Sequence, residues 1–173
     1  MQAQPLANRP SPSTIRVVLV APEIPPNTGN VARTCAATRI PLHLVEPLGF
    51  RLSDRYLKRA GLDYWSAVEL HRHPDWQTLV AHHPGERFWC FSARGQHTYT
   101  DIAYQPGDWL LFGSETRGLP AELLQTFPTV RIPLSGPVRS LNLGNSVAIA
   151  VFEALRQLAL SPGVAQAPIS NES

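Results

Sequence analysis

Residues 132–146 read Ile132-Pro-Leu-Ser-Gly-Pro-Val-Arg139-Ser140-Leu-Asn142-Leu-Gly144-Asn145-Ser146, and they lead directly into the apolar segment 147–158. A strand is predicted to end at Ile132, and the segment 147–158 is predicted to be a helix. The intervening loop brings small polar side chains to the helix start, where unpaired backbone N–H groups can meet a ligand. Any one of these positions alone could equally be an ordinary N-cap or turn residue, so it is the combination of them that points to a site.

Other short apolar runs along the chain are typical of buried strands, and helical segments alternate with them. Strands are expected at 15–20, 42–46, 88–92, 109–112 and 130–132, and helices at 31–39, 53–60, 120–127 and 147–158, with another helix opening at Pro74. The segment 22–30 is expected to be a rigid turn, 63–70 to be partly extended and 96–108 to be a polar connection. This alternation predicts an α/β fold with a mostly parallel sheet and helices on both faces.

Three of the predicted strands end in segments rich in Gly, Ser and Pro, namely 92–95, 113–118 and 133–142. Ligands of parallel α/β sheets bind at the carboxyl ends of the strands. Glycine there lets the backbone approach a ligand closely. We therefore expect the three segments to form one site.

The length of 173 residues and the hydrophobic content of 43% suit one domain with a full core. The domain is expected to span 15–160, because 1–14 and 161–173 have the low hydrophobicity of disordered tails. No apolar run approaches the roughly 20 residues that a bilayer requires, and the N-terminus lacks the apolar core of a signal peptide. A cytoplasmic protein without membrane contact is expected.

The basic residues are fourteen Arg and one Lys, and the formal net charge is only +2. Arginine binds phosphate bidentately and stacks on bases, so this usage suits RNA, although a GC-rich genome would explain it equally well. With so small a net charge, any nucleic-acid site must be a local patch.

Several common catalytic and cofactor motifs are missing from the sequence. It contains no G-x-S-x-G, no G-x-G-x-x-G and no Walker-type phosphate loop. The histidines between 71 and 97 pair with no Cys or acid at a recognised ligand spacing, so no metal is expected. Cys35 and Cys90 fall inside a predicted helix and a predicted strand, where reduced, buried thiols are usual. The remaining backbone amides and Ser, Asn, Glu and Arg side chains suit the positioning of two substrates.

Three motifs occur in order: Asn27-Thr-Gly29-Asn30-Val-Ala-Arg33, Leu111-Phe-Gly113-Ser-Glu115-Thr-Arg117-Gly118-Leu-Pro120, and Ile132-Pro-Leu followed by Arg139-Ser140-Leu-Asn142-Leu-Gly-Asn145-Ser-Val-Ala. They resemble the three motifs of the SPOUT class of RNA methyltransferases, and the similarity covers about 15–160. More specifically, 22–30 and 59–64 resemble the enzymes that methylate the ribose 2′-hydroxyl of the tRNA wobble nucleotide, a cytidine or uridine.

This resemblance implies a C-terminal trefoil knot in about 109–158, an exception to the rule that chains do not knot. It also implies S-adenosyl-L-methionine as the cofactor, with no metal. The residues implied to bind it are Phe91, Gly113, Ile132 and Leu141, mainly through their backbone, with Ser140 and Glu115 beside them.

The implied reaction moves a methyl group to the 2′-hydroxyl of the first anticodon nucleotide. Arg33 is implicated in deprotonating that hydroxyl, and because arginine keeps its own proton, an RNA phosphate would have to assist. Ser140 and Asn142 would orient the ribose. The implied RNA contacts are Asn27, Asn30, Arg117 and Arg139. Alternatively, Glu115 and Arg117 form a structural ion pair.

The expected partners are the anticodon stem-loop of tRNA and a second copy of the chain, because the resembling family pairs two knot regions. Two alternatives stay open: 2′-O-methylation of another tRNA or rRNA nucleotide, and a noncatalytic RNA-binding domain. The joint presence of Arg33, Glu115, Ser140 and Asn142 argues against the noncatalytic domain. The string 22–30 favours the wobble nucleotide.

Overall fold

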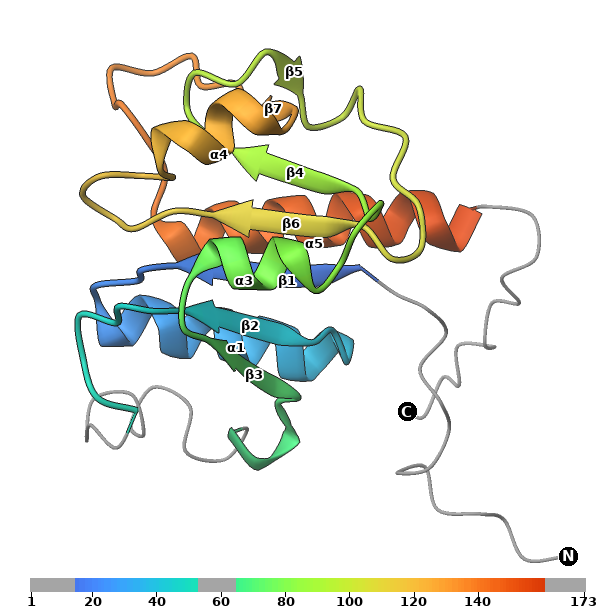
Figure 1. The fold of residues 1–173 in the computed structure, drawn as a ribbon. Coiled ribbons are helices and arrows are strands. Elements are labelled where there is room, and N and C mark those ends of the chain that lie inside the picture. The colour runs from blue at the N-terminus through green and yellow to red at the C-terminus, as the bar shows by residue number, and fades with distance from the viewer. Residues whose placement is uncertain (1–14, 53–64, 161–173) are drawn as a thin grey trace, which may run out of the picture.

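The computed structural model describes residues 15–52 and 65–160, which form one parallel sheet with helices on both faces (Figure 1). Within these residues seven strands follow the order β3-β2-β1-β6-β4-β7-β5, and each pairing is parallel. The strands are β1 (Arg16–Val20), β2 (Leu42–Val45), β3 (Leu70–His73), β4 (Phe88–Phe91), β5 (His97–Thr98), β6 (Trp109–Phe112) and β7 (Thr129–Arg131). The prediction of a parallel α/β sheet is confirmed.

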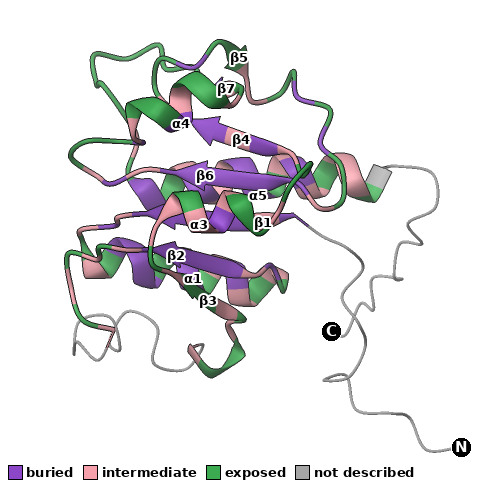
Figure 2. Ribbon diagram, viewed as in Figure 1, coloured by how far each residue is buried: buried purple, intermediate pink, exposed green. Residues whose placement is uncertain are grey.

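The helices divide between the two faces of the sheet (Figure 1). They are α1 (Pro25–Thr38), α3 (Trp76–Ala81), α4 (Ala121–Thr126) and α5 (Leu143–Leu160), with a 3₁₀ turn, η2, at Trp65–Ala67. Val17 and Leu19 pack in one core cluster with α1 and α5, whereas Val18 and Val20 pack in a second cluster with α3 and α4. Because successive side chains of a strand point to opposite faces, β1 is buried on both sides (Figure 2).

The carboxyl ends of the central strands lie side by side. Phe112 at the end of β6 is in register with Phe91 of β4 and with Leu19 of β1. Phe91 is in turn in register with Val130 of β7. The three segments rich in Gly, Ser and Pro therefore emerge at one edge of the sheet, as predicted from the sequence.

Several elements differ from the predictions. Helix α5 begins at Leu143, four residues before the predicted start at 147. Helix α1 begins at Pro25 and takes in most of the expected turn 22–30, because the fixed φ of proline suits the first helical turn. Helix α3 begins at Trp76, after Asp75 as its N-cap, and not at Pro74. Strand β5 lies within the expected polar connection 96–108, and β3 begins at Leu70, the last residue of the segment expected to be partly extended; neither was predicted as a strand. Both lie at the edges of the sheet, where a strand needs no apolar run.

The predicted helix 53–60, most of 63–70 and both predicted tails lie outside the described residues. Within the described part of the chain, no helix combines the length and apolar character that crossing a membrane requires.

Candidate active site

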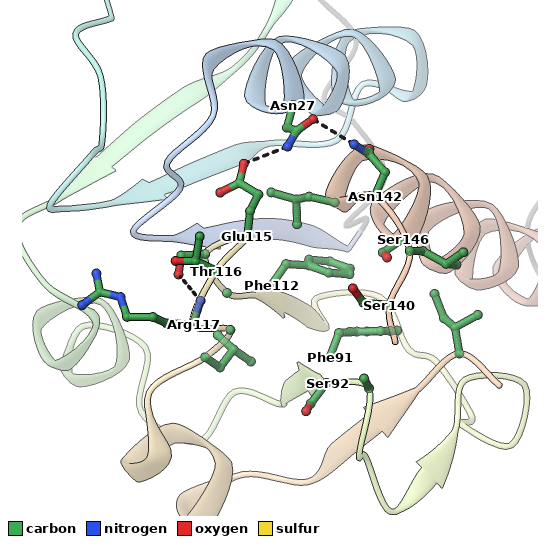
Figure 3. A pocket seen from close by; sticks show the side chains of 18 of the residues that line it. Asn27, Phe91, Ser92, Phe112, Glu115, Thr116, Arg117, Ser140, Asn142 and Ser146 are labelled. Atoms are coloured by element: carbon green, nitrogen blue, oxygen red, sulfur yellow. Dashed lines mark hydrogen bonds between the residues drawn. The ribbon is translucent and has the colours of Figure 1, made fainter. Parts of the chain in front are cut away.

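A cavity of about 610 Å³ opens at the carboxyl ends of β4, β6 and β7 (Figure 3). Its walls come from the three loops that follow these strands and from the first turns of α1 and α5. Of the residues predicted to bind a cofactor or substrate, those that line the cavity are Asn27, Phe91, Gly113, Glu115, Arg117, Ile132, Ser140, Leu141 and Asn142. The structure thus brings together most of the predicted site.

Two aromatic rings form an apolar part of the cavity wall. Phe91 and Phe112 stack with ring centroids 4.6 Å apart, and Val130 and Leu119 lie beside them in the lining. The backbone of Gly113 borders the same region, and a side chain there has no room, since a Cβ would lie 1.9 Å from the carbonyl carbon of Gly118. Apolar surface beside open backbone suits the flat, weakly polar face of a nucleoside.

Glu115 connects the loop after β6 to the start of α1. Its carboxylate accepts hydrogen bonds from the backbone N–H groups of Glu23 (2.8 Å) and Ile24 (3.2 Å) and from Nδ2 of Asn27 (3.0 Å). No side-chain cap of its own serves α1 at Ile24, so Glu115 supplies the negative group that a helix start favours.

Glu23 makes the reciprocal connection between the same two loops. Its carboxylate accepts hydrogen bonds from Oγ1 of Thr116 (2.7 Å) and the Thr116 backbone N–H (3.3 Å), and lies 3.8 Å from the Arg117 guanidinium. The alternative pairing of Arg117 with Glu115 is therefore wrong, because Arg117 faces Glu23. Arg117 itself is exposed at the cavity rim, where a phosphate could reach it.

Asn142 caps the start of α5 and contacts α1. Its Oδ1 accepts hydrogen bonds from the backbone N–H groups of Gly144 (2.9 Å) and Asn145 (3.4 Å), while its Nδ2 donates to Oδ1 of Asn27 (2.9 Å). The N-cap interpretation of residues 140–146 is therefore correct for Asn142, which also lines the cavity. Capping and ligand contact are compatible in one side chain.

Arg33, Asn30 and Arg139 are exposed, and none belongs to the lining of the main cavity. Arg33 lies six residues after Asn27 on α1, and at about 100° per residue this turns it well away from the Asn27 side. Arg139 lines a smaller adjoining hollow of about 310 Å³ with Arg131 and Val138. The roles expected of these three residues, toward the ribose hydroxyl and the RNA, therefore stay predictions.

The cavity also includes residues that sequence reasoning did not single out. They are Phe112, Thr116 and Leu119, among others. All three lie inside the second motif, so position next to a motif residue was the available signal.

The two thiols do not belong to this site. Burial raises the pKa of both Cys35 and Cys90 to about 12, which keeps them protonated and unreactive. Within residues 15–52 and 65–160, no three His, Cys, Asp or Glu side chains are placed to hold a metal ion.

Residues 14–152 match the SpoU rRNA Methylase family. The chain belongs to this family. Over 152 residues it is 53% identical to a tRNA (cytidine(34)-2′-O)-methyltransferase of Burkholderia ambifaria, covering 85% of this chain and 97% of that relative. This SpoU family member is also similar to a solved structure that concerns 2′-OH methylation of C/U34 on tRNA, with 53% identity, a TM-score of 0.83, and coverage of 86% of this chain and 99% of the other.

A second similar structure was solved with a bound cofactor. It is an AdoMet-bound rRNA methyltransferase of Sinorhizobium meliloti, 28% identical, with a TM-score of 0.78 and coverage of 86% of this chain and 58% of that chain. The family assignment makes the protein a methyltransferase.

Proposed function

We propose that this protein transfers a methyl group from S-adenosyl-L-methionine to the ribose 2′-hydroxyl of the wobble nucleotide of tRNA, cytidine or uridine 34. The observation that carries the proposal is that one cavity, at the ends of three strands, is lined by Phe91, Gly113, Ser140 and Asn142 together. The high identity to a relative that acts on cytidine 34 supports the choice of nucleotide.

The cavity residues fit the proposed cofactor. Phe91, Ile132 and Leu141 offer apolar contact and backbone groups for a nucleoside, and the bare backbone at Gly113 allows close approach. Ser140 supplies a hydroxyl, and Glu115 closes the side next to α1. When bound, S-adenosylmethionine supplies an electrophilic methyl carbon on a cationic sulfur.

The chain's own residues have to align the ribose and handle one proton. Ser140 and Asn142, exposed at the cavity, hold the 2′-hydroxyl oxygen in line with the methyl carbon. The bound cofactor would supply the methyl group on a cationic sulfur that leaves as a neutral thioether, a chemistry that would require no metal or oxyanion hole of the protein. The hydroxyl proton passes to an RNA phosphate held by Arg33, because arginine keeps its own proton.

Arg33 reaches a site in this proposal only if two chains combine. The Arg33 side chain is exposed and absent from the lining of its own chain's cavity. Helix α5 also carries an exposed large apolar side chain, Phe152 (58% exposed). We infer a two-fold homodimer in which Arg33 of the partner subunit completes each cavity. Asn30, Arg117 and Arg139 then line the path of the anticodon stem-loop.

We also infer that residues 109–158 are threaded as a trefoil knot, as the resemblance implies. The methyltransferase domain is inferred to span 15–160. A tRNA substrate would place the protein in the cytoplasm.

Methyl transfer to anticodon stem-loops tests the proposal. Purified protein and S-adenosylmethionine with a labelled methyl group should label a stem-loop with cytidine or uridine at position 34. A matched stem-loop with 2′-deoxycytidine at 34 should stay unlabelled, because it lacks the acceptor oxygen. Equal labelling of both stem-loops would show that the methyl group goes to an atom other than the 2′-oxygen of nucleotide 34. Labelling of rRNA fragments but not stem-loops would favour the alternative substrate, and no labelling of any RNA would favour the noncatalytic domain.

A further inference from the structure

Three side chains from separate parts of the sequence form a continuous line of hydrogen bonds beside the cavity (Figure 3). Nδ2 of Asn27 donates to Oε1 of Glu115 (3.0 Å), and Nδ2 of Asn142 donates to Oδ1 of Asn27 (2.9 Å). Oδ1 of Asn142 then accepts the backbone N–H of Gly144 (2.9 Å). The line joins the loop after β6, the first turn of α1 and the first turn of α5.

The two ends of this line fix its direction. A carboxylate only accepts hydrogen bonds, and Glu115 is also held by two backbone N–H donors, from Glu23 and Ile24. Asn27 must therefore turn its NH₂ group toward Glu115, which leaves its oxygen facing Asn142. At the other end the backbone N–H of Gly144 can only donate, so the oxygen of Asn142 must face α5.

Burial makes this arrangement costly to change. Asn27 is only 9% exposed. Rotating its amide by 180° would set its Nδ2 against Nδ2 of Asn142 and its oxygen against the carboxylate of Glu115, and both hydrogen bonds would be lost. The amide of Asn142 is held in one orientation from both sides. Its oxygen is taken by Gly144 and Asn145, and one of its two Nδ2 hydrogens is taken by Asn27.

We propose that Glu115 and Asn27 are positioning residues, which fix Asn142 so that it presents an N–H donor, and not its carbonyl oxygen, to the ribose. This inference rests on the proposed function, in which Asn142 contacts the ribose. A donor to the 2′-oxygen orients that oxygen without accepting its proton. The proton must then leave toward another group, which agrees with the proposed role of an RNA phosphate.

The kinetic test uses Glu115→Gln, in which one carboxylate oxygen becomes an NH₂ group. At saturating cofactor and stem-loop, this change should slow single-turnover methyl transfer roughly 10- to 100-fold, because Asn142 would no longer hold the ribose 2′-oxygen in its reactive position. The dissociation constant for S-adenosylmethionine, measured by calorimetry, should change less than about threefold if Glu115 acts through Asn142. Glu122→Gln is the matched control, an exposed carboxylate on α4, and should leave both values unchanged.

A double-mutant comparison separates positioning from a general structural effect. In an Asn142→Ala background, Glu115→Gln should slow the residual reaction less than about twofold, since the group through which it acts is gone. An equal slowing in both backgrounds would overturn the proposal. So would a large loss of cofactor affinity with an unchanged rate, which would make Glu115 a direct cofactor ligand.

A spectroscopic test does not depend on activity. The side-chain NH₂ signal of Asn142, identified by its loss in Asn142→Ala, should shift in Glu115→Gln but not in Glu122→Gln. Asn27→Ala should shift the same signal, and it serves if Glu115→Gln does not fold. If neither change shifts the Asn142 signal, the proposal that Glu115 and Asn27 orient Asn142 is refuted. If the wild type methylates no RNA, the proposed function fails, and this measurement still decides whether Glu115 orients Asn142.

Discussion

Asn142 and Arg33 are both exposed, so neither side chain fills the core. Asn142→Ala and Arg33→Ala should each slow methyl transfer on the order of 10²-fold or more, because each removes a group that acts on the reacting ribose. Arg33→Ala should leave S-adenosylmethionine binding intact, because in the proposed dimer Arg33 acts on the RNA phosphate and not on the cofactor. Single-turnover assays, calorimetry and thermal unfolding check these outcomes. Near-normal turnover in a folded variant would remove that residue from the mechanism.

Gly113 is a position where the backbone itself forms the site. In Gly113→Ala the new Cβ would lie 1.9 Å from backbone of Gly118, which no side-chain movement can relieve. We expect a loss of about 1–3 kcal/mol in the free energy of unfolding, together with weaker cofactor binding. Gly136→Ala is the matched control in the loop after β7, because a Cβ there meets nothing within 4 Å. Equal stability of the two variants in denaturant unfolding would contradict this account.

At the scale of elements, β2 and β3 place a group of histidines on the face of the sheet covered by α3. His43 is 5% exposed, stacks on His71 with centroids 4.5 Å apart, and has Nδ1 2.9 Å from Nε2 of His73. Its Nε2 is buried without a hydrogen-bond partner among the described residues. Desolvation, followed by the charges of His71, His73, Arg16 and His83, lowers the pKa of His43 to about 2.

This lowered pKa predicts acid sensitivity of the fold. Between pH 6.5, where the unfolded histidine titrates, and about 2, the unfolded chain binds more protons than the folded chain. Stability is therefore full above pH 6.5 and should fall below it by up to about 1.4 kcal/mol per pH unit for this group. His43→Phe should show a shallower fall between pH 7.5 and 5 in urea unfolding, and His97→Phe, an exposed control, should keep the wild-type slope. Parallel slopes for the wild type and His43→Phe would contradict the assignment.

At the scale of the whole molecule, the proposed site needs two chains. Coexpressed Arg33→Ala and Asn142→Ala chains with different tags would form mixed dimers in which one site carries both lesions and the other carries neither. If Arg33 of the partner subunit completes each cavity, the isolated mixed dimers should regain about half of the wild-type activity, one of two sites being intact. If all groups act within one chain, every site carries a lesion. Folded mixed dimers without activity would refute the shared site.

The sequence by itself determined the sheet and the edge at which the cavity opens. Runs such as 17–20 and 109–112 are apolar throughout because both faces of a parallel strand are buried, and this requirement is visible locally. The Gly, Ser and Pro segments after β4, β6 and β7 then had to meet, because parallel strands end at one edge. The short edge strands β3 and β5 escaped prediction, since their polar residues need no such burial.

Only the tertiary structure decided how the site residues are used. Glu115 and Asn27 are 88 positions apart, and Asn27 and Asn142 are 115 apart, so no local pattern could show that they share hydrogen bonds. The same holds for Arg117, which faces Glu23 and not Glu115, and for Arg33, which the turn of α1 carries away from the cavity. Residue type sets which hydrogen bonds a side chain can make. Which of them it makes depends on where separate loops come together, and the packing of α1 and α5 against the sheet fixes those positions.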